Sequence, residues 1–148
     1  METNKPVEMK QVKSQGGNFR WVAVSALLLA IGAIMRLVSP SFAGVSINWI
    51  ITMYCITILV IHPSVPKAVA IGIVAGAINT ITSKSPMPHL NLLSEPIGAL
   101  TCVLLMALPF GMKIGSVSLR PGLITFVTTF ASGFTFITSF KILMNVPT

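Results

Sequence analysis

The stretch Ser83-Lys84-Ser85-Pro86-Met87-Pro88-His89-Leu90-Asn91-Leu92-Leu93-Ser94-Glu95-Pro96 separates two strongly apolar segments of the chain. It contains Glu95, the only acidic residue after Glu8. Pro86 and Pro88 exclude a regular helix across it, because proline lacks a backbone donor and restricts the residue before it. We therefore predict a loop between two membrane spans, and we place the mouth of a binding site there.

The composition is that of an integral membrane protein with one domain. Of 148 residues, 53% are hydrophobic and only 9% are charged, whereas a soluble domain carries about 25% charged residues. The mean hydropathy of +0.87 agrees. The net charge of +7 comes from basic residues scattered at segment ends, which indicates membrane topology rather than a basic nucleic-acid-binding face. We expect a lipid bilayer as surroundings and no nucleic acid as partner.

Apolar runs predict an all-α membrane protein that is a bundle of five transmembrane helices. The presence of a sixth helix is left open. Residues 1–18 are expected to form a flexible cytoplasmic tail, and residues 19–148 a single transmembrane helical domain. A cleaved signal peptide is the less favoured alternative for the first run, because the run is long and Arg36 interrupts it. The predicted spans are 21–38, 47–61, 68–82, 96–110 and about 121–144.

Basic residues predict the orientation, because they concentrate in cytoplasmic segments. With the N-terminus in the cytoplasm, the outside holds three basic residues, Arg36, Lys84 and Lys141. The same orientation places the central stretch outside. The inside then holds the other seven basic residues: Lys5, Lys10, Lys13, Arg20, Lys67, Lys113 and Arg120.

Two spans carry small residues at helical spacing. Ala26 and Ala30 form an AxxxA pattern in the first span, and Gly72 and Gly76 form a GxxxG pattern in the third. Small residues allow a second helix backbone to approach closely. For the third span we favour packing within the chain.

The fifth span carries a stripe of hydroxyl side chains. Such side chains can bond to carbonyls of their own helix, so the stripe need not bind a ligand. It consists of Thr125, Thr129, Ser132, Thr135 and Ser139.

Ser94, Glu95 and Pro96 resemble a helix start, with a capping residue before a proline in the first turn. The free amides of such an N-terminus favour an anion. Arg36 and Lys84 add positive charge, and Glu95 can accept a bond from an ammonium group or a ring N–H. Together they suit a small zwitterionic or carboxylated ligand with an apolar body.

Simpler interpretations remain open for three of these residues. In these interpretations Glu95 caps a helix without binding a ligand, Lys84 is an exposed interfacial lysine, and His89 is an ordinary loop histidine.

No arrangement of catalytic or metal-binding residues is recognisable. The chain has no aspartate, its other glutamates lie in the tail, and it has no phosphate-binding glycine loop. Cys55 and Cys102 have no metal-site spacing. We therefore expect no enzyme activity, no catalytic residue, no metal and no cofactor.

Residues 21–33, with the AxxxA pattern after a basic tail, resemble the substrate-binding S components of energy-coupling factor (ECF) transporters. The run from Gly72 to Gly76, then 79–82, Pro86 and Asn91, looks most like the tryptophan-associated members. The similarity covers most of residues 20–110. The family usually has six spans, whereas five are predicted here.

This resemblance implies an ECF-type ABC importer in a bacterial cell membrane. Its multi-pass S component would capture a small vitamin-like or amino-acid ligand from outside, with tryptophan as a named candidate. Its partners would be a transmembrane coupling protein and two ATPase subunits, with Ala26 and Ala30 as the docking face. The alternative is a non-catalytic structural or assembly subunit of a membrane complex. The candidate ligand-binding residues are Arg36, Asn79, Lys84, His89, Asn91 and Glu95.

Overall fold

The computed structural model describes residues 19–144 except 43–44, 110, 112 and 115–116, and this part of the chain contains five α-helices. The predicted all-α, five-helix bundle is confirmed. The predicted tail, residues 1–18, lies outside the described residues. The helices are α1 (Arg20–Val38), α2 (Trp49–Ile61), α3 (Val65–Thr82), α4 (Asn91–Ala107) and α5 (Arg120–Met144).

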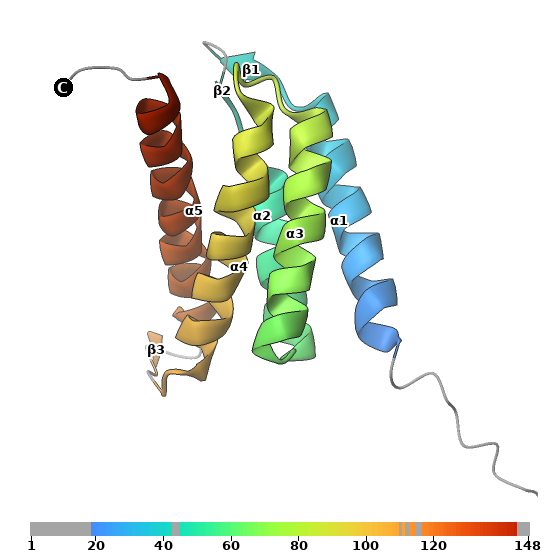
Figure 1. Ribbon diagram of the computed structural model, residues 1–148. Coiled ribbons are helices and arrows are strands. Elements are labelled where there is room, and N and C mark those ends of the chain that lie inside the picture. Colours follow the sequence, from blue (N-terminus) through green and yellow to red (C-terminus); the bar gives the residue numbers. More distant parts are fainter. Residues whose placement is uncertain (1–18, 43–44, 110, 112, 115–116, 145–148) are drawn as a thin grey trace, which may run out of the picture.

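Four of the helices are long and apolar enough to cross a membrane, and α2 is the exception. Its 13 residues extend about 20 Å, which is less than the hydrocarbon core of about 30 Å. α2 contacts all four other helices, and Ile50, Tyr54 and Ile58 on it are fully buried. Figure 1 shows α2 behind α3 and α4, with α1 and α5 on opposite flanks of the bundle. The core is therefore built around the shortest helix.

Short connections close the two ends of the bundle. Two-residue strands β1 (Ser41–Phe42) and β2 (Val45–Ser46) pair in antiparallel fashion between α1 and α2. Strands β3 (Lys113–Ile114) and β4 (Val117–Ser118) pair likewise between α4 and α5. The two hairpins lie at opposite ends of the bundle (Figure 1). A 3₁₀ turn, η2 (Pro88–Leu90), precedes α4.

Helices α3 and α4 pack backbone against backbone at the GxxxG pattern. A β-carbon on Gly72 would lie 2.7 Å from the α-carbon of Pro96, and one on Gly76 would lie 2.7 Å from the carbonyl oxygen of Asn91. Neither position has room for a side chain, because the neighbouring atoms belong to backbone. The prediction that this pattern serves packing within the chain is confirmed.

The predicted start of the fourth helix at Ser94–Pro96 was wrong. α4 begins at Asn91, directly after η2, so Pro96 lies inside the helix. Pro96 removes the donor that would bond to the carbonyl four residues earlier, a loss that membrane helices tolerate where neighbouring elements surround the site. Glu95 is consequently an interior helical residue with 1% of its surface exposed. It is not the first-turn cap that the sequence suggested.

We predict that Gly72→Ala and Gly76→Ala each destabilise the protein. The added methyl group would overlap the α4 backbone and force the helices apart, a kind of overpacking that costs about 1–3 kcal/mol. The measurement is thermal unfolding of the purified protein in detergent. Gly122→Ala is the matched control, because a β-carbon there would meet no atom within 4 Å. Equal stability of all three variants would refute the packing role.

Candidate ligand-binding site

A cavity of about 380 Å³ lies between residues of α1, α2, α4 and α5 and the connection between α3 and α4. Cavities of this size are typical of small-molecule sites. The charged side chains Arg36 and Glu95 line it from α1 and α4. Asn48, immediately before α2, lines it as well.

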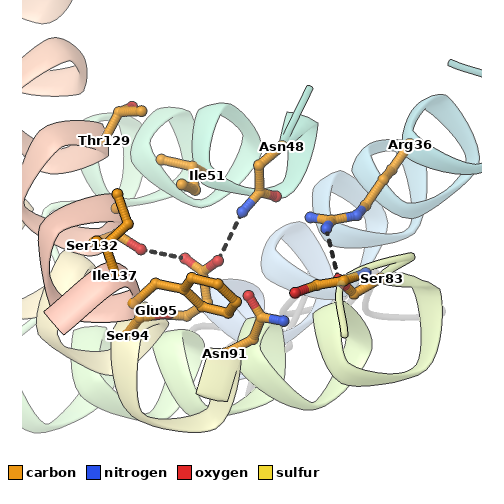
Figure 2. A pocket seen from close by; sticks show the side chains of 13 residues that line it. Arg36, Asn48, Ile51, Ser83, Asn91, Ser94, Glu95, Thr129, Ser132 and Ile137 are labelled. Atoms are coloured by element: carbon orange, nitrogen blue, oxygen red, sulfur yellow. Dashed lines mark hydrogen bonds between the residues drawn. The ribbon is translucent and has the colours of Figure 1, made fainter. Parts of the chain in front are cut away.

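The carboxylate of Glu95 is held by donors from three other parts of the chain. Asn48 donates from Nδ2 to Oε1 at 2.7 Å, and Asn79 donates from its Nδ2 to the same oxygen. Ser132 of α5 donates to Oε2 at 3.3 Å. Figure 2 shows the bonds from Asn48 and Ser132 converging on Glu95 from opposite sides. One carboxylate thus connects α3, α4, α5 and the residue that precedes α2.

Arg36 is joined to this carboxylate through Asn79. Its Nη1 donates to Oδ1 of Asn79 at 2.6 Å, and its Nη2 donates to the hydroxyl of Ser83 at 3.3 Å. Asn79 is fully buried, and Arg36 is 7% exposed. A single carboxamide therefore stands between the positive and the negative group, accepting from one and donating to the other.

This arrangement lets two opposite charges lie inside an apolar bundle. A charged group in a membrane span is costly, so such groups face the interior, find partners and usually mark a functional site. Arg36 and Glu95 carry opposite charges, so the cavity wall is close to neutral overall. A ligand bound there keeps this balance if it carries both charges itself.

Two polar atoms in the cavity wall have no hydrogen-bond partner among the described residues. They are Nε of Arg36, a donor with positive charge, and Oδ1 of Asn48, an acceptor. Buried polar atoms without partners are uncommon in folded proteins. The Arg36 atom is suited to a carboxylate, and the Asn48 atom is suited to an N–H group.

One face of α5 forms the opposite wall. Thr129, Ser132, Gly133 and Phe136 line the cavity, and their spacing of three, one and three places them on one side of a helix. Phe136 supplies an aromatic surface, and Ile51 of α2 adds a second apolar surface. The site thus combines charged groups from α1 and α4 with an apolar wall.

The structure brings together four of the six predicted ligand-binding residues. Arg36, Asn91 and Glu95 line the cavity, and Asn79 lies behind it as the bridge. Lys84 and His89 are exposed and do not line it.

Several residues of the site were missed or misjudged in the sequence. Asn48 and Ser83 were not singled out, and their only signal was a polar side chain at the end of an apolar run. Ser132 was included in the hydroxyl stripe, of which three other members, Thr125, Thr129 and Thr135, do bond to carbonyls of their own helix. Ser132 differs because it reaches Glu95.

The predicted docking residues Ala26 and Ala30 are both exposed on α1. A small groove of about 160 Å³ adjoins this face, and Ala26 of α1 lines it together with Ala70 and Val74 of α3. The close contact of α1 with α2 involves Gly32 rather than these two alanines. A β-carbon on Gly32 would lie 3.0 Å from Cγ of Met53.

The fold and the cavity define the class: a small multi-pass helical membrane protein with a charge-balanced, solute-sized cavity. Residues 18–148 match the family described as tryptophan transporter TrpP, and the chain belongs to this family of membrane transporters. A probable tryptophan transport protein of Bacillus subtilis (strain 168) is 28% identical over 129 residues, which cover 85% of this chain and 72% of that protein. No solved structure matches the chain. The resemblance to tryptophan-associated members inferred from the sequence is thereby confirmed.

We predict that Asn79→Leu destabilises the protein strongly. The change removes the acceptor of Arg36 and a donor to Glu95 together, and each group left without its partner costs about 1–3 kcal/mol. Thermal unfolding in detergent measures the effect. Thr80→Val is the control on the same helix, because its hydroxyl bonds only to the backbone carbonyls of Gly76 and Pro88. Similar stabilities of the two variants would show that the bridge contributes little.

Proposed function

We propose that the protein is the substrate-binding component of an ECF-type importer and captures tryptophan from outside the cell. The observation that carries the proposal is the cavity between Arg36 and Glu95, with charges of both signs and an apolar wall. The family to which the chain belongs supports tryptophan as the ligand. The proposed location is a bacterial cell membrane.

The distribution of basic residues supports an outward-facing cavity. Arg20, Lys67 and Arg120 lie at the starts of α1, α3 and α5, all at the end of the bundle opposite the cavity. Basic residues concentrate on the cytoplasmic side of membrane proteins. The end with Arg36, Asn48 and the α3–α4 connection is then the outer one.

The proposed ligand fits the chemistry of the wall. An α-carboxylate would accept from Nε of Arg36, because the other two nitrogens of this guanidinium already donate to Asn79 and Ser83. An ammonium group would donate to Glu95 and to Oδ1 of Asn48. The indole ring would lie against Phe136 and the neighbouring α5 surface. Each charged group of the ligand then meets an opposite charge.

Energy for uptake must come from elsewhere, because the sequence has no phosphate-binding loop. We propose that a transmembrane coupling protein and two ATPase subunits supply it, with Ala26 and Ala30 as the docking face. The exposure of both alanines supports this. We propose no catalytic role for any residue.

The second candidate is a structural subunit of a membrane complex. The exposed small-residue face of α1 favours this candidate as much as it favours the uptake function. A permanent packing subunit, however, has no use for a cavity with an unpartnered arginine nitrogen. We therefore prefer the uptake function.

We predict that Arg36→Gln lowers tryptophan affinity by roughly ten- to a hundredfold, since a hydrogen bond to a charged group contributes about 1.5–3 kcal/mol. Tryptamine, which lacks the carboxylate, should bind the variant at least as well as the wild type, because only the negative charge of Glu95 then remains in the cavity wall. Equilibrium dialysis with labelled ligands measures both affinities. Lys84→Gln, which neutralises an exposed lysine at the same end, should change neither. Equal losses for both ligands, or a comparable loss in the lysine variant, would contradict the assignment of Arg36.

We predict that Ala26→Trp combined with Ala30→Trp abolishes uptake while tryptophan binding persists. The two bulky rings would block the approach of a partner helix, because close approach depends on small residues. The measurements are uptake in cells, ligand binding after purification and co-purification of the ATPase subunits. Phe126→Trp with Phe130→Trp is the control, since both phenylalanines are exposed on α5 at the opposite flank. Undiminished uptake by the alanine variant would rule out this docking face.

A further inference from the structure

The helical glycines of the described chain fall into two groups. A β-carbon on Gly32, Gly72, Gly76 or Gly98 would lie 3.0 Å or less from an atom of a neighbouring helix. These glycines are explained by close packing. Gly122 and Gly133 of α5 differ, because a β-carbon on either would meet nothing within 4 Å.

Packing and backbone geometry do not explain Gly133. Glycine in the middle of a helix lowers stability relative to alanine, because it gives up more backbone freedom on folding. Gly133 lies fourteenth of the 25 residues of α5, whereas Gly122 lies in the first turn. The backbone at Gly133 does not have a positive φ, so any residue could adopt it. Helix propensity would favour alanine at this position.

The open space beside Gly133 belongs to the cavity. Gly133 lines it together with Ser132 and Phe136. Ser132 bonds to Glu95, and Phe136 lies three residues further along α5, on the same face as Gly133. Gly133 therefore lies between the charged end of the site and its aromatic surface. A side chain at this position would fill the space where the body of a ligand anchored at Glu95 must lie.

We propose that Gly133 determines the size of the ligand side chain that the cavity accepts, leaving room for a bicyclic ring beside Phe136. This proposal rests on the proposed function, since it takes an aromatic amino acid as the ligand. A methyl group at Gly133 narrows the space, and a branched side chain occupies it. The headgroup contacts with Arg36 and Glu95 are unaffected by either change.

The test compares Gly133→Ala and Gly133→Leu with Gly122→Leu in the full-length protein. Affinities for tryptophan and for the smaller phenylalanine are measured by equilibrium dialysis and competition, after gel filtration and circular dichroism have established folding. One extra methylene group in a hydrophobic pocket changes discrimination between ligands by about ten- to two-hundredfold. We expect a loss of tryptophan affinity near the lower end of this range with Gly133→Ala, a larger loss with Gly133→Leu, and none with Gly122→Leu. The preference for tryptophan over phenylalanine should fall in the same order.

The outcomes separate this inference from the proposed function. If the wild-type protein does not bind tryptophan, the proposed function fails and the inference fails with it. If the wild type binds tryptophan and Gly133→Leu binds it equally well, only the inference is overturned. An equal loss with Gly122→Leu overturns it too. If Gly133→Leu does not fold, Gly133→Ala decides, and unchanged affinity and preference in that variant refute the role of Gly133.

Discussion

The hydrogen-bonded series Arg36–Asn79–Glu95 is the constraint on which the rest of the structure depends. It places two opposite charges in an apolar bundle without direct contact between them. A direct ion pair would satisfy both groups and leave little for a ligand to bind. The intervening carboxamide of Asn79 stabilises both charges and leaves them able to interact with a ligand. Because α1, α3 and α4 each contribute one member, the series also fixes how these helices are placed along one another.

The close contact between α3 and α4 makes this series possible. Gly76 lies against the backbone of Asn91 and Leu92, and Asn79 follows it by less than one turn. Gly72 lies against Pro96 and the carbonyl oxygen of Glu95. The two glycines therefore fix the register that brings the Asn79 amide to the Glu95 carboxylate. The small-residue pattern is in this way part of the site, although neither glycine lines the cavity.

Sequence reasoning predicted the bundle well, because the bilayer demands apolar runs of about 20 residues. It also singled out Arg36, Asn79 and Glu95, since polar groups stand out against such runs. It failed at the start of α4, where Pro96 was read as a helix start although α4 begins five residues earlier. It could not assign Asn48 or Ser132 to Glu95, because each lies far from Glu95 along the chain and nothing in one sequence records their proximity. Lys84 and His89 were named for their chemistry alone, and the structure leaves both exposed.

The shortness of α2 determines how deep the ligand would be bound. This helix is roughly six or seven residues shorter than a helix that crosses the hydrocarbon layer. Figure 1 shows its upper end below those of α1 and α3. The missing turns leave a recess at this end of the bundle, and Asn48 and Ile51, at the start of α2, line the cavity there. A solute bound there would lie beside the buried charges of Arg36 and Glu95, and the attraction between charges is strong where water is excluded. Lengthening the central helix by two turns would fill this recess without altering any residue that lines its sides.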